Sequence, residues 1–276
     1  MLNLMYITNN PEIALIAEKN GVNRIFVDLE TLGKEERQKN MNSVKSHHTV
    51  DDVKAVSSVL TKSELLVRVN PWHENSVNEI DAVISAGADR IMLPMWKSAE
   101  EVSMFLNAVN GRTGTTLLLE TKEAASCIDV VLDNEKLDEI HIGLNDLHLS
   151  YGLTFMFELI SNGVVESLCS KMRNKGIKYG FGGIARIGEG TLPAENILYE
   201  HIRLGSTAVI LSRSFFDCSV TTDYDCINDV FNKEIKKLRS KESELSAFDV
   251  QTLQLKHMET AEIISSIVSK LRRDRA

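Results

Sequence analysis

Several features of secreted, membrane-bound and nucleic-acid-binding proteins are missing from this sequence. Its four cysteines form no Cys-x-x-Cys pair, so a zinc site built from them is disfavoured and reduced thiols are expected. No apolar run approaches the roughly 18 residues that span a bilayer, and the start of the chain lacks the charged and apolar segments of a signal peptide. The formal net charge of −8 opposes binding to nucleic acids and anionic lipids. These absences predict a cytoplasmic protein whose partners include neither nucleic acids nor membranes.

What the sequence does contain is a regular alternation of short apolar runs with helix-like segments. The expected strands are residues 2–8, 24–30, 64–70, 90–95, 115–121, 139–146, 178–185 and 208–215. The expected helices are residues 11–21, 49–60, 76–87, 98–111, 122–132, 157–176, 193–205 and 225–245. Strand–helix units that repeat in this way predict an α/β fold with a parallel sheet closed as a (β/α)8 TIM barrel. The alternative, an open doubly wound sheet, carries a glycine-rich turn after its first strand, and the segment YITNNPE has no glycine.

The chain continues beyond the eight units. We therefore divide it into a barrel domain, residues 1–248, and a C-terminal helical extension, residues 249–276. Apolar residues recur in the extension at helical spacing, which predicts one extra helix. Such a helix either packs on a neighbouring subunit or lies on the surface of its own barrel.

Two of the expected helices begin with the pattern of a capping box. Ser76 is followed by Glu79, and Ser98 is followed by Glu101. In a capping box the serine hydroxyl accepts the backbone N–H of the residue three positions later, whose acidic side chain reaches back to the serine N–H. The pattern predicts Ser76 and Ser98 as the N-caps of their helices.

Chemistry in such a barrel takes place at the C-terminal ends of the strands. The fifth and sixth expected strands, which are neighbours in the barrel, end in the carboxylates Glu120 and Asp146. Two carboxylates at adjacent strand ends can hold one hard divalent cation such as Mg²⁺ or Mn²⁺. Alternatively, each carboxylate caps the following helix or pairs with an arginine.

Arg68 lies within LLVRVN, an otherwise apolar strand. A buried guanidinium is costly unless it meets an anion, and arginine can grip a carboxylate or enolate oxygen through two N–H groups. The first hypothesis is that Arg68 binds a substrate anion. The alternative is an ion pair with Asp28 or Glu30 at the end of the neighbouring strand, and the two states could alternate.

The seventh and eighth strands end in glycines and basic residues. Gly182 and Gly183 could form a phosphate-binding turn, to which Arg186 and Arg213 would add positive charge, or the glycines could simply allow a tight turn. His47 and His48 lie in a polar loop, where a solvated surface position is the favoured interpretation.

Several short segments, in this order, resemble the HpcH/HpaI aldolase and citrate lyase β-subunit family, whose fold is a barrel of the phosphoenolpyruvate/pyruvate type. The segments are VDLE, VRVN, GADRIMLP, LLLET and IGLNDLHLSYG, and the resemblance extends over most of residues 24–215. Its most specific parts are the Glu-Thr of the fifth strand and the Gly-x-Asn-Asp-Leu-x-x-Ser-x-Gly motif after the sixth.

This resemblance implies a metal-dependent carbon–carbon lyase that acts on a pyruvate-type 2-oxo acid through a metal-stabilised enolate. By position, Glu120 and Asp146 match the family's ligands for Mg²⁺ or a similar cation. Arg68 matches the arginine that holds the substrate carboxylate or enolate. The family commonly assembles as trimers or hexamers, so a homo-oligomer is also implied.

The segment after the second strand departs from the family's pattern, because Thr31 stands where the aldolase branch usually has a histidine that helps proton transfer. We assign Glu30 to catalysis together with Arg68, while Asp28, a metal-bound water or a loop histidine stay alternatives for the base. The residues assigned to substrate binding are Arg68, Asp28, Gly143, Asn145, Arg186 and Arg213.

Two other functions stay open. The glycines and arginines after the last two strands favour a transferase or lyase that uses phosphoenolpyruvate or an acyl-CoA in surface-sugar biosynthesis. The replacement of the family histidine by Thr31 favours a barrel that binds a ligand without catalysis.

Overall fold

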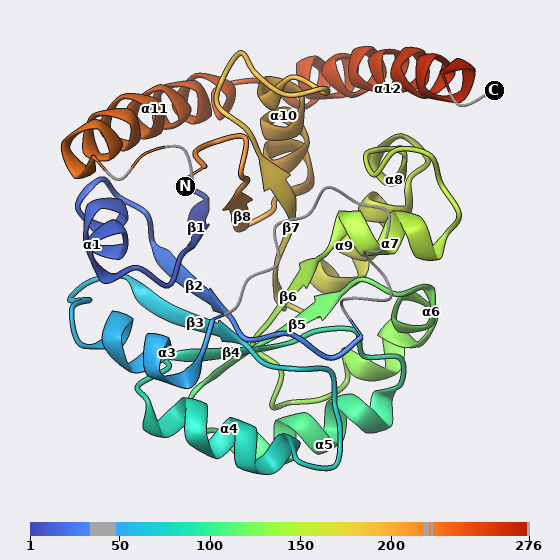
Figure 1. Ribbon diagram of the computed structural model, residues 1–276. Coiled ribbons are helices and arrows are strands. Elements are labelled where there is room, and N and C mark those ends of the chain that lie inside the picture. The colour runs from blue at the N-terminus through green and yellow to red at the C-terminus, as the bar shows by residue number, and fades with distance from the viewer. Residues whose placement is uncertain (34–47, 218–220, 222, 275–276) are drawn as a thin grey trace.

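The barrel predicted from the sequence is present. The computed structural model describes residues 1–33, 48–217, 221 and 223–274. Eight parallel strands pair in chain order, and pairing of the first with the last closes the barrel, with the helices arranged around it (Figure 1). The strands are β1 (Asn3–Ile7), β2 (Arg24–Asp28), β3 (Glu64–Arg68), β4 (Arg90–Leu93), β5 (Gly114–Leu119), β6 (Glu139–Ile142), β7 (Lys178–Ile184) and β8 (Ala208–Leu211).

The helices fill the crossovers between these strands, with one correction to the expected series. They are α1 (Pro11–Lys19), α3 (Val50–Ser57), α4 (Ser76–Ser85), α5 (Ala99–Val109), α6 (Lys122–Val131), α7 (Leu144–Ser150), α8 (Glu158–Ser161), α9 (Val164–Asn174), α10 (Ala194–Leu204), α11 (Tyr224–Leu245) and α12 (Val250–Arg273). The single helix expected over 157–176 is two helices, because Gly163 adopts a φ of 81° between α8 and α9. A left-handed residue of this kind cannot continue an α-helix, and glycine adopts it without strain.

The capping-box prediction is wrong for α4 and correct in part for α5. Ser76 is the first residue of α4, which begins after Asn75 without a side-chain cap. The carboxylate of Glu79 is used elsewhere, by the side chains of Asn70 and His73. Ser98 does cap α5, through a bond of 3.2 Å from the N–H of Glu101 to its hydroxyl.

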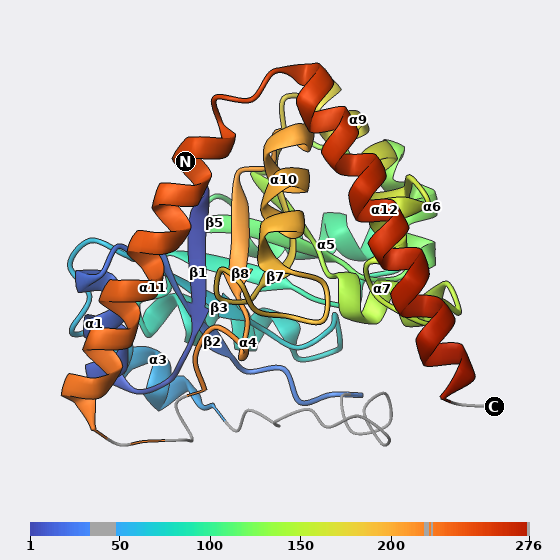
Figure 2. The ribbon, with the colours of Figure 1, turned by 90° about the horizontal axis from the view of Figure 1, so that it is seen from above.

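The C-terminal segment forms the expected extra helix. Figure 2 shows α11 and α12 as two long helices that form the arms of an inverted V on the outside of the barrel. Helix α12 packs against α10 and α8 of its own chain, and Asn196 of α10 donates to the buried hydroxyl of Thr260 at 2.9 Å. The trimer or hexamer implied by the family resemblance stays a prediction.

The interior of the barrel is layered, and its charged groups lie at the two ends, whereas the buried His141 of β6 lies level with Leu118 of the middle layer. The middle layer is apolar and consists of Met5, Phe26, Leu66, Met92, Leu118 and Ala208. Below it, toward the N-terminal ends of the strands, Arg24 bonds to Glu139 at 2.7 Å and to Glu64 at 2.6 Å. Each of these charges is paired, so this layer closes the bottom of the barrel. The charged groups above the apolar layer, at the C-terminal ends, form the candidate site.

Within the described ranges, none of the helices has the length and apolar character that crossing a bilayer demands. Cys127, Cys169 and Cys226 are free thiols, as predicted, whereas Cys218 lies outside the described residues. The cytoplasmic location stays a prediction.

Candidate functional site

An ion cluster lies at the C-terminal ends of β2 and β3. Arg68, the last residue of β3, donates from Nε and Nη2 to the two carboxylate oxygens of Asp28, at 2.8 Å each. Its Nη1 lies 3.2 Å from Oε2 of Glu30. The ion pair considered as an alternative for Arg68 is therefore present, with both acidic partners. A bidentate pair fixes the plane of the guanidinium, and this orients the remaining N–H groups.

The cluster is almost removed from solvent. Asp28 and Glu30 are 3% and 2% exposed, and Cζ of Arg68 lies 5.6 Å from the ring centroid of Phe26, in the apolar layer. Burial alone would lower the pKa of Arg68, but its acidic neighbours, led by Asp28, raise it above the ordinary value. The guanidinium therefore stays charged in an environment where its charge is weakly screened.

Glu120, which follows β5, is buried beside this cluster and is 3% exposed. Its Oε1 accepts the backbone N–H of Met95 at 3.0 Å. Met95 has a φ of 55°, a left-handed conformation that side-chain-bearing residues rarely adopt and that concentrates at functional sites. Burial raises the pKa of Glu120 to about 8; Arg68 opposes this shift, and the charge of Asp146 adds to it. The negative charge of an ionised Glu120 is therefore only partly offset by the neighbouring groups of the protein.

The raised pKa of Glu120 predicts how the stability of the metal-free protein depends on pH. Its folded pKa is about 8 and its ordinary value is 4.5, so the folded state holds a proton that the unfolded state releases between these values. The contribution is fully present below pH 4.5 and is lost as pH rises through 8, by up to about 1.4 kcal/mol per pH unit. We expect Glu120→Gln to become progressively more stable than the parent protein as pH rises from 5 to 8, and the difference to level off above pH 8.

Urea unfolding in the presence of EDTA measures this difference. Glu135→Gln, an exposed acid before β6, is the matched control and should show no such trend. A constant difference between Glu120→Gln and the parent protein across the range would contradict the buried, protonated state of Glu120.

Asp146 lies opposite Glu120, although not at a strand end as expected. Strand β6 ends at Ile142, and Asp146 is in the first turn of α7, where the helix N-terminus favours a negative charge. Glu120 and Asp146 line one pocket of about 370 Å³, together with Met95, Lys97, Thr121, Glu123, Leu149 and Ser150. We call this the carboxylate pocket. The two carboxylates thus share one pocket, and their assignment as metal ligands stays a prediction.

The residues present fit a divalent cation. The buried Glu120 and the half-buried Asp146 share the pocket, where burial and, to a smaller extent, the charge of Asp146 raise the pKa of Glu120. A side chain at position 143 would crowd Glu120, because its Cβ would lie only 3.0 Å from Oε2 of that residue. Glycine at this position avoids the close contact. Among the described residues no three His, Cys, Asp or Glu side chains gather as a metal-binding group. A site with two protein ligands leaves the remaining positions of a hard cation to water and substrate oxygens.

The arginines expected after the last two strands do not line the carboxylate pocket. Nε of Arg186 donates to the carbonyl of Phe215 at 2.5 Å, which ties the loop after β7 to the loop after β8. Arg213 is exposed, and so is Asn145 in the first turn of α7. Their assignment to substrate binding stays a prediction.

Sequence reasoning missed the contacts that hold the loop after β2. Oδ1 of Asn70 accepts the backbone N–H groups of Thr31 at 2.8 Å and of Leu32 at 2.9 Å. Nδ2 of Asn70 donates to Glu79 at 2.7 Å, which fixes the orientation of the amide. Asn70 is the last residue of the strand expected over 64–70, and only the structure identifies its partners.

His48 also lies closer to the site than its loop position suggested. Its Nδ1 accepts the backbone N–H of Asp28 at 3.0 Å, and the residue is half-buried. The interpretation of His48 as a solvated surface residue is therefore wrong. His47 lies outside the described residues.

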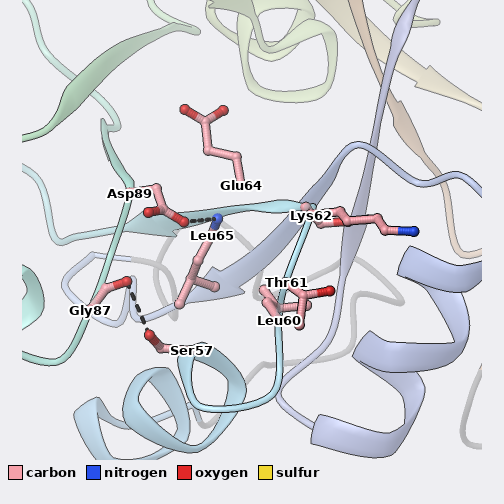
Figure 3. A pocket seen from close by; sticks show the side chains of 9 residues that line it. Ser57, Leu60, Thr61, Lys62, Glu64, Leu65, Gly87 and Asp89 are labelled. Atoms are coloured by element: carbon pink, nitrogen blue, oxygen red, sulfur yellow. Dashed lines mark hydrogen bonds between the residues drawn. The ribbon is translucent and has the colours of Figure 1, made fainter.

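A second hollow lies at the opposite end of the barrel, where β3 and β4 begin. It measures about 490 Å³ and is lined by residues 57, 60–65, 87 and 89. Figure 3 shows that Asp89 accepts the N–H of Leu65 and that Ser57 bonds to the carbonyl of Gly87. Glu64 is paired with Arg90 at 2.9 Å and with Arg24. Glu64 and Asp89 therefore have protein partners at this end, and chemistry in such a barrel takes place at the opposite, C-terminal end.

A comparison with protein families matches more than half of the chain. The family model for HpcH/HpaI aldolase/citrate lyase matches residues 3–160, which carry the strands and loops that supply Arg68, Glu120 and Asp146. None of the curated proteins matches the sequence.

Solved structures share the fold at low sequence identity. An HpcH/HpaI aldolase from Desulfitobacterium hafniense DCB-2 is 15% identical with a TM-score of 0.60, over 86% of this chain and 93% of that one. An HpcH/HpaI aldolase/citrate lyase family protein from Burkholderia cenocepacia J2315 is 11% identical with a TM-score of 0.60, over 86% and 95% of the chains. Protein CitE from Mycobacterium tuberculosis, in complex with magnesium and pyruvate, is 14% identical with a TM-score of 0.60, over 94% and 97%.

Proposed function

The chain belongs to the HpcH/HpaI aldolase/citrate lyase family, and from this premise we propose that it is a divalent-metal-dependent lyase. The proposed reaction makes or breaks a carbon–carbon bond beside the carbonyl group of a pyruvate-type 2-oxo acid. The observation that carries the proposal is the pair Glu120 and Asp146 in one pocket, beside a guanidinium whose plane is fixed by Asp28.

Glu120 and Asp146 are the residues that would hold the cation, and Mg²⁺ or Mn²⁺ suits their oxygen ligands. Such a cation, when bound, supplies Lewis-acid polarisation of a substrate carbonyl. The CitE structure with magnesium and pyruvate supports this choice of cation and substrate class. Gly143, which follows β6, has no side chain that would press against the carboxylate of Glu120.

The chain's own groups have distinct tasks in this proposal. Arg68 binds the substrate carboxylate through the N–H groups that Asp28 does not use, so Asp28 acts on the substrate by orienting Arg68. Glu30 is our candidate for moving the proton from the carbon next to the carbonyl. Glu30 lies 3.2 Å from Arg68, whereas Asp28 lies 2.8 Å from it. A substrate carboxylate could therefore displace Glu30 from Arg68, and Glu30 would then be available as the base.

Exchange of the methyl protons of pyruvate tests the function without any knowledge of the second substrate. We expect the protein with Mg²⁺ or Mn²⁺ in D₂O to remove the methyl signal of pyruvate from the proton NMR spectrum, and EDTA to stop the exchange. Glu30→Gln should slow it by about 100-fold or more, the usual contribution of a positioned proton-transfer group. Absence of exchange with every divalent cation tried, over several pH values, would count decisively against the proposal.

A further inference from the structure

A second pocket adjoins the carboxylate pocket and has a different chemical character. It measures about 350 Å³ and is lined by Leu32, Gly33, Pro71, Trp72, His73, Met95, Lys97 and Glu101. We call it the tryptophan pocket. Met95 and Lys97 line both pockets, so a molecule held at the carboxylates has a neighbouring space into which a bonded group can extend.

Part of the wall of the tryptophan pocket is apolar. Leu32, Pro71 and Trp72 come from the loops after β2 and β3, and all three are half-buried or exposed rather than sealed in the core. An indole ring with an accessible face binds planar apolar groups well, since stacking adds to the gain from burying apolar surface.

The polar residues of the pocket do not create an excess of positive charge. The positive charge of Lys97 and the negative charge of Glu101 both lie in the lining of the pocket. The carboxylate of Glu101 accepts the backbone N–H of Lys97 at 2.6 Å. Nε2 of His73 lies 3.2 Å from Glu79, and its Nδ1 accepts the N–H of Asn75. The histidine is therefore occupied by protein partners. A pocket of this composition favours an uncharged group over a second carboxylate or a phosphate.

The apolar wall is also held in place. Asn70 binds the backbone of Thr31 and Leu32 on one side and Glu79 on the other, and Glu79 in turn contacts His73, the neighbour of Trp72. This chain of hydrogen bonds joins the two loops that carry Leu32 and Trp72, so the pocket is preorganised for a ligand.

Resting on the proposed function, we propose that the tryptophan pocket is the subsite for the second substrate, and that this substrate is an aldehyde with an uncharged apolar, preferably aromatic, group. In the reaction the methyl carbon of pyruvate loses a proton and forms a bond to the aldehyde carbon, and the aldehyde oxygen gains a proton. The reverse reaction breaks the same bond and needs no further reactant. The apolar group lies against Trp72, while the reacting carbons meet at the wall formed by Met95.

Selectivity between two aldehydes tests the assignment. We expect the protein to use benzaldehyde with a higher kcat/KM than glycolaldehyde, with pyruvate as the common partner. Trp72→Ala should lower the benzaldehyde-to-glycolaldehyde ratio of kcat/KM by about tenfold. Trp72→Phe, which keeps an aromatic face, should stay within about threefold of the parent ratio. An unchanged ratio in Trp72→Ala would overturn the proposal.

Binding can be followed without catalysis because the sequence has two tryptophans, and Trp96 is 1% exposed. Benzyl alcohol, which cannot react, should change the tryptophan fluorescence of the parent protein and leave that of Trp72→Phe unaltered. An equal change in both proteins, or none in either, would overturn the subsite. Pyruvate exchange in the parent protein separates the two failures: its absence refutes the proposed function, while exchange without aromatic selectivity refutes only the subsite.

Discussion

Asp146→Ala is expected to abolish divalent-cation-dependent turnover while the protein stays folded. Asp146 and Glu120 are the two carboxylates of the carboxylate pocket, and Glu120 alone offers a hard cation one protein ligand. Loss of a Lewis acid removes several kcal/mol of transition-state stabilisation, which corresponds to a rate loss of about 1000-fold or more. The fold should survive because Asp146 is only half-buried and lies in the first turn of a surface helix.

The metal-free variant should also be no less stable than the parent protein. The negative charge of Asp146 helps to raise the pKa of Glu120, so its removal relieves repulsion between two neighbouring carboxylates. Calorimetric titration with Mn²⁺, pyruvate exchange and urea unfolding measure the three properties. Asp129→Ala is the matched control, since Asp129 is an exposed acid that pairs with Lys171 at 2.7 Å on the barrel's outer surface. Cation-dependent exchange that persists in Asp146→Ala would remove Asp146 from the metal site.

The sequence predicted the barrel because each strand–helix unit carries its own local signals, which act over a few residues. The apolar run before Arg68 and the one before Glu120 identify strand ends, and the barrel rule then gathers those ends at one face. The expected strand through Asp146 was too long by four residues, since the strand stops at Ile142 and a helix follows. Leu144 continues the strand-like alternation of Ile140 and Ile142 and is also buried as the first residue of the helix, so alternation alone could not locate the end of the strand.

The contacts between segments that are far apart in the chain could not be predicted from the sequence. Parallel strands are apolar on both faces, so the pattern does not say which side chains point into the barrel. The pairing of Arg24 with Glu139 joins residues far apart in the chain and follows only from the closed topology. The same is true of Asn70 and Thr31, which meet because β2 and β3 are neighbours.

Arg68→Met is expected to reduce both activity and stability, and to do so by separable mechanisms. The substitution leaves Asp28 and Glu30 buried without their cation, and the loss of one partner from a buried ion pair costs about 3–5 kcal/mol. Arg68 also lowers the pKa of Glu120, so without it that carboxyl group should be harder to ionise. Urea unfolding should show the loss, and a free energy of unfolding within about 1 kcal/mol of the parent value would contradict the buried cluster.

The combination Arg68→Met, Asp28→Asn and Glu30→Gln distinguishes the two mechanisms. Neutral amides of the same shape no longer demand a cation, so most of the lost stability should return. Pyruvate exchange should not return, because neither the guanidinium that holds the substrate carboxylate nor the candidate base is present. Arg68→Lys is the third comparison: it keeps the charge and much of the stability, but a lysine cannot make the bidentate contact, so its KM for pyruvate should rise by about tenfold or more. Recovery of exchange in the triple variant would show that Arg68 is needed only to neutralise its two acidic neighbours.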